Sequence, residues 1–304
     1  MVRIVEVGPR DGLQNESTPI PTDIKLRFIR DLVEAGLTEI EVSSFVSPKW
    51  VPQLADAAEV FSELALSPPH PPIHSSPQFS ALVPNLKGLE RALECGVSRI
   101  ALFTAASDAF TQKNINMTVA QSLDVFRQVV EAFRGARPDG HVRAYISTAF
   151  ECPYAGRIEP KATANIARAL EDDLAVDEIS LGDTIGAAVP SEVEILHEHV
   201  ALYVPQAKVA WHFHDTRGTA IANVAKALEL GYKAFDSSAG GLGGCPYAPG
   251  AGGNLATEDL VYFLERSGIG TGISLEKLAR ASLPALEALG RKPASKAQVA
   301  TLAG

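Results

Sequence analysis

Short runs of β-branched and apolar residues alternate along the chain with segments whose apolar positions recur every three to four residues. The runs predict strands buried on both faces, and the spaced positions predict amphipathic helices. Strand-like runs begin near Arg3, Thr38, Phe79, Ser98, His141, Asp177, Lys208 and Lys233. Helix-like segments cover roughly 22–35, 52–64, 85–95, 118–133, 160–175, 190–203, 218–230 and 255–266. We expect Thr22 to be the N-cap of the first helix and Gly36 to end it.

Eight strands that alternate with helices predict a parallel sheet covered by helices, and eight is the number of strands that closes a barrel. The predicted fold is therefore α/β, a (β/α)₈ TIM barrel, with an open doubly wound sheet as the alternative. We expect one catalytic domain over 1–304, with a C-terminal helical extension at 268–304. Within that extension the pattern predicts one helix over 274–289 and a tail from Lys292.

Composition and charge exclude several classes of protein. The 304 residues carry a net charge of −9, whereas nonspecific nucleic-acid binding needs a basic surface. No apolar run is long enough for a membrane span, and strand-like sequence begins at Val2, so we expect no leader peptide and no membrane partner. Only three cysteines occur, which does not suggest a disulfide framework. The expected location is the cytoplasm.

Polar residues gather where the predicted strands end, which is where TIM barrels carry their catalytic groups. His212 and His214 are two apart on one strand, so both imidazoles point to the same face. A pair of hydrogen-bonded histidines would be the ordinary interpretation. Asp11 and Asn254 can supply oxygen ligands, however, and this set predicts a divalent cation, Mg²⁺ or Mn²⁺, with Zn²⁺ and Co²⁺ as alternatives.

Two further residues suggest chemistry. Arg10 precedes Asp11 and can either form a structural salt bridge or face an oxygen that gains negative charge. Cys245 follows a Gly-rich stretch, the setting of a reactive thiol, whereas Cys95 and Cys152 are expected to be structural. The glycines do not form a Rossmann or P-loop pattern, so no nucleotide cofactor is expected.

These residues lie in motifs that cover nearly the whole chain and resemble 3-hydroxy-3-methylglutaryl-CoA (HMG-CoA) lyases. The motifs are Val7-Gly-Pro-Arg-Asp-Gly-Leu-Gln-Asn-Glu16, Ser44-Phe-Val-Ser-Pro-Lys-Trp-Val-Pro52, Glu178-Ile-Ser-Leu-Gly-Asp-Thr-Ile-Gly186, His212-Phe-His-Asp215 and Gly241-Leu-Gly-Gly-Cys-Pro-Tyr247. The resemblance implies a TIM barrel that cleaves HMG-CoA to acetyl-CoA and acetoacetate with a divalent cation. It also implies a homodimer.

The resemblance assigns roles to single positions. The implied metal ligands are Asp11, His212, His214 and Asn254. Arg10 and Cys245 match the catalytic arginine and the loop cysteine, and Glu41 and Asp183 match active-site acids. Lys292 falls in the segment that contacts CoA.

Three alternatives stay open at this point. Related lyases act on longer 3-hydroxy-3-alkylglutaryl-CoA substrates, and these motifs do not exclude them. A Claisen-condensing synthase of the isopropylmalate or homocitrate type shares the Arg-Asp and His-x-His pattern, but typically reads His-x-His-Asn-Asp rather than His-Phe-His-Asp-Thr. A catalytically inactive barrel is the third alternative, and the intact set of site residues argues against it.

Overall fold

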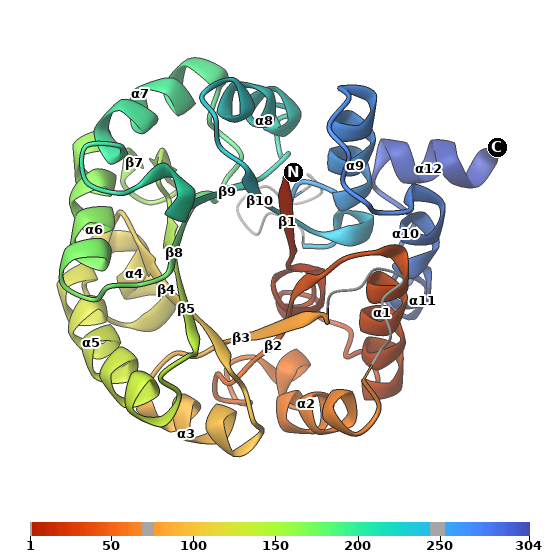
Figure 1. Cartoon of the computed structure of the whole chain (residues 1–304), viewed down its shortest axis with the longest axis horizontal. Coiled ribbons are helices and arrows are strands. Elements are labelled where there is room, and N and C mark those ends of the chain that lie inside the picture. The colour runs from red at the N-terminus through yellow and green to blue at the C-terminus, as the bar shows by residue number, and fades with distance from the viewer. Residues whose placement is uncertain (1, 69–75, 244–252) are drawn as a thin grey trace.

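The computed structural model describes residues 2–68, 76–243 and 253–304, and within them eight parallel strands close into a barrel (Figure 1). The order around the barrel is β1-β10-β9-β8-β5-β4-β3-β2. The strands are β1 Arg3–Glu6, β2 Glu39–Ser44, β3 Gln78–Leu82, β4 Arg99–Ala105, β5 His141–Ser147, β8 Glu178–Asp183, β9 Val209–Phe213 and β10 Ala234–Ser237. The predicted barrel is confirmed, and each strand begins within one residue of its expected position.

Helices surround the barrel in chain order (Figure 1). Their apolar stripes pack on the outward side chains of the strands, and this layer forms the main hydrophobic core. The helices of the ring are α1 Thr22–Ala35, α2 Ala57–Leu66, α3 Leu86–Glu94, α5 Val119–Ala136, α6 Pro160–Asp172, α7 Pro190–Val200, α8 Ala220–Glu229 and α9 Thr257–Arg266. Gly36 ends α1 in the left-handed conformation, as predicted, but the N-cap is Pro21 and Thr22 is already helical.

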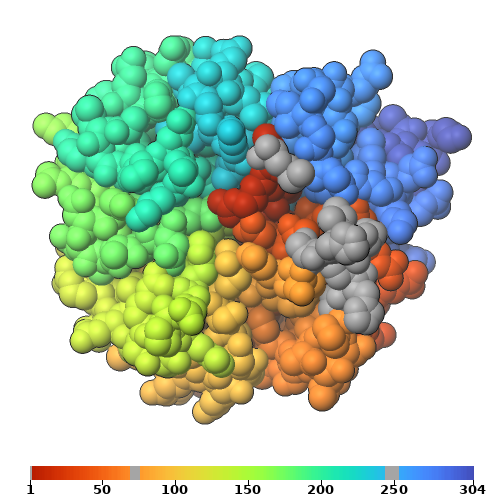
Figure 2. All heavy atoms as spheres, viewed as in Figure 1, coloured from red at the N-terminus to blue at the C-terminus, as the bar shows by residue number. Residues whose placement is uncertain are grey.

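Three more helices lie outside the ring, beside α1 and α9 (Figure 1), and form a projection on one side of the molecule (Figure 2). They are α10 Leu275–Ala281, α11 Leu283–Ala288 and α12 Lys296–Ala303. The single helix expected over 274–289 is wrong, because Pro284 lacks the N–H that would continue the helix and instead starts α11. The expected tail is also wrong over its last turns, where Ser295 caps α12 and Gln298 is buried.

A helix and a hairpin inserted between elements of the barrel were also not predicted. Helix α4, Asp108–Ile115, follows β4, and its N-terminus is capped by the Ser107 side chain. A short antiparallel hairpin, β6 Glu151–Cys152 with β7 Gly156–Arg157, follows β5. In the described part of the chain, no helix is both long and apolar enough to cross a bilayer.

The register of the strands brings the polar strand ends together. Glu6 of β1 is level with Ser237 of β10, and Asp236 is level with His212 of β9. Because all eight strands are parallel, their carboxyl ends meet at one mouth of the barrel.

Candidate metal centre and active site

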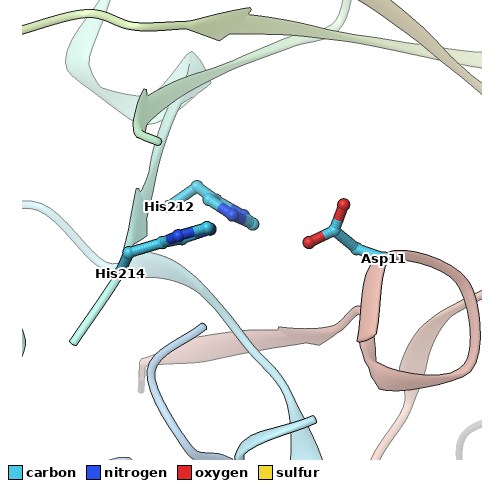
Figure 3. Close-up of side chains that lie close together, drawn as sticks. All are labelled: Asp11, His212 and His214. Atoms are coloured by element: carbon cyan, nitrogen blue, oxygen red, sulfur yellow. The ribbon is translucent and has the colours of Figure 1, made fainter. Parts of the chain in front are cut away.

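Asp11, His212 and His214 converge on one point at this mouth. Asp11 lies in a five-residue π-helical turn, Gly8–Gly12, directly after β1, and the two histidines lie at the end of β9. Figure 3 shows both imidazole rings pointing toward the Asp11 carboxylate. One ligand atom from each residue lies within 4.8 Å of the others. The prediction that His212 and His214, two residues apart, point to the same face is therefore confirmed.

Asn254 completes this group from the segment that precedes α9. It pairs with His214 in an antiparallel bridge. Its Nδ2 donates to Asp11 Oδ2 at 2.9 Å and to the carbonyl of Leu242 at 3.2 Å. Its Oδ1 is buried and has no hydrogen-bond partner in the described structure. The amide thus presents a free oxygen beside Asp11 and His214.

The chemistry of these donors fits a divalent cation. Nδ1 of His214 is a second buried atom without a partner in the described residues. Burial, and then the neighbouring His212, lower the pKa of His214 to about 3, so its imidazole is neutral at physiological pH, the form that binds metals. Two imidazoles, one carboxylate and one amide oxygen suit Mg²⁺ or a divalent transition metal such as Mn²⁺.

Asp236 orients the first of these histidines. Its Oδ2 lies 3.1 Å from His212 Nδ1, and Ser180 donates to the same oxygen at 2.8 Å. Burial opposes ionisation of Asp236, but Arg143 and His212 outweigh it and lower the pKa of this carboxyl. An ionised Asp236 only accepts hydrogen bonds, so Nδ1 of His212 carries the proton and Nε2 is left for a metal.

Arg10 is held between two acids. It is almost fully buried, its Nε donates to Glu41 Oε1, and its Nη1 donates to Asp11 Oδ1 at 2.6 Å. Although burial would lower the pKa of Arg10, Glu41 and Asp11 raise it, so the guanidinium stays charged. Burial would raise the pKa of Asp11, but Arg10 and then His212 lower it to about 2. Neither acid engages Nη2.

A buried chain of polar side chains connects Arg10 with the Asp236–His212 pair. Tyr145 donates to Glu41 Oε2 at 2.9 Å, and its ring lies between two guanidinium groups, 5.2 Å from that of Arg10 and 5.0 Å from that of Arg143. Arg143 also pairs with Asp236. Our sequence analysis gave none of the β5 residues a role. The available signal was a charged and an aromatic residue two apart, each next to apolar residues of one strand.

The metal group lines a cavity of about 570 Å³. Arg10, Gln14, Asn114 and Ser147 contribute polar groups to its wall. Other parts of the wall are apolar and come from the segments around β2, β3, β4, α4 and α5, with Val46, Trp50, Val51, Leu82, Phe103, Phe110, Ile115, Met117, Val125 and Phe126. The cavity can therefore hold a ligand that has both charged and apolar parts.

The two other predicted acids, Glu41 and Asp183, do not line the cavity. Glu41 is fully buried behind Arg10 and does not line the cavity. Asp183 is also buried, and its two oxygens accept the N–H groups of Ala187 and Ala188 at 2.9 and 3.1 Å. Burial raises the pKa of Asp183 to about 6. The structure therefore does not bring Asp183 into the group around Arg10, and a catalytic role for it stays a prediction.

Two predicted residues lie away from this group or outside the described chain. Lys292 is exposed in the segment between α11 and α12. Cys245 lies outside the described residues. The other two cysteines are free thiols, with Cys152 buried and Cys95 half-buried, and their expected structural roles stay predictions.

The HMGL-like family profile matches residues 1–283. The chain belongs to the HMGL-like family. It is 48% identical over 302 residues to the 3-hydroxy-3-isohexenylglutaryl-CoA/hydroxy-methylglutaryl-CoA lyase of Pseudomonas aeruginosa, covering 99% of this chain and 97% of that protein.

Solved structures of the family agree with the fold. A crystal structure of hydroxymethylglutaryl-CoA lyase from Pseudomonas aeruginosa matches with a TM-score of 0.92 and 48% identity, over 99% of this chain and 97% of the other. An HMG-CoA lyase from Acinetobacter baumannii, in complex with coenzyme A and 3-methylmalate, matches with a TM-score of 0.87 and 38% identity, over 97% and 93% of the two chains. The family and the barrel implied by the sequence motifs are therefore both confirmed.

Proposed function

We propose that this protein cleaves HMG-CoA to acetyl-CoA and acetoacetate. The observation that carries the proposal is the convergence of Asp11, His212 and His214 within 4.8 Å, beside the buried Arg10, in the wall of one cavity. The similarity to lyases at 48% identity supports the same reaction. We propose that the whole chain, 1–304, acts as one catalytic unit with residues 268–304 as its helical extension.

Asp11, His212, His214 and Asn254 would hold the divalent cation, with Mg²⁺ or Mn²⁺ preferred over Zn²⁺ or Co²⁺ because half of the donors are oxygens. When bound, the cation supplies Lewis-acid polarisation of substrate oxygens. We propose that no nucleotide cofactor takes part.

The reaction breaks the bond between C2 and C3 of the substrate. The 3-hydroxyl loses its proton as C3 becomes the ketone of acetoacetate, and the electron pair of the broken bond remains on the thioester fragment. Among the three acids considered, only Asp11 lines the cavity, so we assign it to accept this proton. Arg10 presents Nη2 to the thioester oxygen that gains negative charge, and Glu41 positions Arg10 through Nε.

The resulting carbanion must gain a proton at C2. We propose Cys245 as the donor, on the basis of its motif, because a thiol has a suitable pKa for general acid catalysis. Cys245→Ser should then bind Mn²⁺ and substrate nearly normally, with kcat lower by about 10²-fold or more. Cys152→Ser serves as the matched control, and equal kcat for the two variants would remove Cys245 from the mechanism.

Further features rest on the family resemblance. We propose that Lys292 contacts the CoA moiety, that the protein is a homodimer, and that it acts in the cytoplasm. A homodimer has twice the 32.2 kDa chain mass, which light scattering measures directly. Lys292→Ala should raise KM for HMG-CoA without changing kcat, since it would contact only the non-reacting part of the substrate.

A second substrate class is favoured by the apolar wall of the cavity. Its aliphatic and aromatic side chains offer more apolar surface than one methyl substituent can cover. The Pseudomonas relative is named as a lyase of 3-hydroxy-3-isohexenylglutaryl-CoA as well as of hydroxy-methylglutaryl-CoA. We therefore propose that longer 3-alkyl substituents are also accepted.

Turnover assays separate these functions. HMG-CoA and 3-hydroxy-3-alkylglutaryl-CoA analogues of increasing length are tested with EDTA, and then with Mg²⁺ or Mn²⁺, and acetyl-CoA release is measured. Cleavage of HMG-CoA only with added metal supports the proposal. Condensation of acetyl-CoA with a keto acid, without cleavage of HMG-CoA, would instead identify a synthase.

A further inference from the structure

Glu6 is a fully buried carboxyl at the end of β1 that has no part in the proposed reaction. Its Oε1 accepts the N–H of Gly8 at 2.7 Å and the N–H of Ala239 at 2.9 Å. Its Oε2 accepts the hydroxyl of Thr257 at 2.6 Å. One side chain thus joins the turn after β1 to two segments that lie 233 and 251 positions further along the chain.

Each of these segments leads to a residue of the active site or precedes residues 244–252. Gly8 begins the π-helical turn that carries Arg10 and Asp11. Ala239 precedes residues 244–252, and Thr257 follows Asn254 by three positions at the start of α9. The two histidine ligands, in contrast, sit at the end of a barrel strand. The positions of the Asp11 and Asn254 ligands therefore depend on how these loop segments are held together.

The residues next to the Glu6 carboxyl restrict where it can lie. A Cβ atom on Gly8 would lie 2.5 Å from Glu6 Oε1, so a larger residue at that position would displace the Glu6 carboxyl. Beside it, the fully buried Glu258 accepts the N–H of Gly240 on both oxygens at 2.9 Å. Gly240 has a φ of +71°, so this second acid fixes a left-handed residue next to Ala239.

We propose that Glu6 is a positioning residue that couples the turn carrying Arg10 and Asp11 to the segments before and after residues 244–252, and so sets the affinity of the site for its divalent cation. The proposal rests on the metal centre proposed above. Among the described residues, neither Glu6 nor Glu258 forms an ion pair with Lys, Arg or His. Burial raises the pKa of Glu6 to about 7, which agrees with a role based on hydrogen bonds rather than on charge.

The test uses Mn²⁺ binding to the full chain, measured by electron paramagnetic resonance, together with kcat at saturating Mn²⁺. Glu6→Ala should weaken Mn²⁺ affinity by about 10-fold or more, the scale for loss of a residue that orients metal ligands. Glu6→Gln should restore affinity, because its amide oxygen still accepts from Gly8 and Ala239, and its amide nitrogen can donate to the Thr257 hydroxyl. If Glu6 acted through its negative charge alone, Glu6→Gln would bind Mn²⁺ as weakly as Glu6→Ala.

Asn223→Ala is the matched control, since Asn223 is a fully buried polar side chain on α8 that does not line the cavity. It should lower Tm without changing Mn²⁺ affinity. If Glu6→Ala loses Tm but binds Mn²⁺ like wild type, the proposal is wrong. If that variant does not fold, Thr257→Val decides, because it removes only a hydroxyl: weaker Mn²⁺ binding supports the coupling, and unchanged binding overturns it. A wild-type protein that binds no Mn²⁺ would instead refute the metal centre itself.

Discussion

Asn254 donates its side-chain amide to Asp11 across 243 positions of sequence, at an Nδ2–Oδ2 distance of 2.9 Å. The bond joins the two oxygen-donor residues of the proposed metal centre before any metal binds. It also fixes the amide so that Oδ1 is the atom left without a partner in the described structure. The site is therefore organised by contacts within the protein, which lowers the cost of assembling it around a cation.

Gly243 allows this arrangement because it has no side chain. Its φ is +94°, and a Cβ atom there would lie 2.6 Å from Asn254 Nδ2. Gly243→Ala should therefore displace the Asn254 amide and weaken Mn²⁺ binding by about 10-fold or more, with the fold retained. Isothermal titration measures the affinity. Gly96→Ala is the control, since Gly96 also has a positive φ but has no atom within 4 Å of the added Cβ. Equal affinities for both variants would contradict this role for Gly243.

Arg10→Gln should keep the fold and the metal but lower kcat by at least about 10²-fold, the scale for losing one donor to a developing oxyanion. Lysine should restore activity only in part, because it lacks the planar guanidinium that spans Glu41 and Asp11. Steady-state kinetics with HMG-CoA measures both effects. A near-normal kcat in Arg10→Gln would show that Arg10 is only a structural ion-pair partner.

Glu41 and Asp183 should behave differently although both are buried acids. Glu41→Gln loses the charged contact that holds Arg10, so kcat should fall by about 10-fold or more while KM changes little. Among the described residues, Asp183 accepts only backbone N–H groups, so Asp183→Asn should lower the free energy of unfolding by about 1–2 kcal/mol and leave kcat nearly unchanged. A larger loss of kcat in Asp183→Asn than in Glu41→Gln would show that Asp183 takes part in the chemistry.

Glu258 should make stability depend on pH between about 4.5 and 8. Burial raises the pKa of Glu258 from 4.5 to about 8, so between these values the native state binds more protons than the unfolded state. The free energy of unfolding must then fall as pH rises through this window. Glu258→Gln stays neutral and still accepts from Gly240, so its free energy should fall less between pH 6.5 and 8.5. Urea denaturation across this range measures both slopes, and identical slopes would show that Glu258 does not titrate there.

The parts of the molecule that depend on local sequence pattern could be predicted from the sequence. β-branched runs identified the strands because such residues fill a sheet buried on both faces. The His212–His214 pair could be placed on one face because side chains alternate along a strand. Asp11 could be assigned to the same mouth because parallel strands end there. The C-terminal helices were less predictable, since α12 is stabilised by tertiary contacts of Gln298 with Ala279 and Ser282 rather than by a clear apolar stripe.

Contacts between distant strands could not be derived from the sequence. Tyr145 and Glu41 are 104 positions apart, and their hydrogen bond depends on how the barrel closes. Asp183 illustrates the same limit, because an acid at a strand end can face the cavity or bind its own loop, and the sequence does not distinguish these orientations. The hydrogen bond between Asp236 and His212 also required knowledge of the register between β9 and β10.

The central claim is that a divalent cation held by Asp11, His212, His214 and Asn254 is required to break a carbon–carbon bond of HMG-CoA. The most direct measurement combines Mn²⁺ stoichiometry with acetoacetate formation for wild type, His214→Ala and the distant control His199→Ala, whose half-buried side chain lies on α7. We predict one Mn²⁺ per chain and metal-dependent acetoacetate formation for wild type and His199→Ala, with both lost in His214→Ala. Acetoacetate formation by His214→Ala in EDTA, at the wild-type rate, would contradict the account.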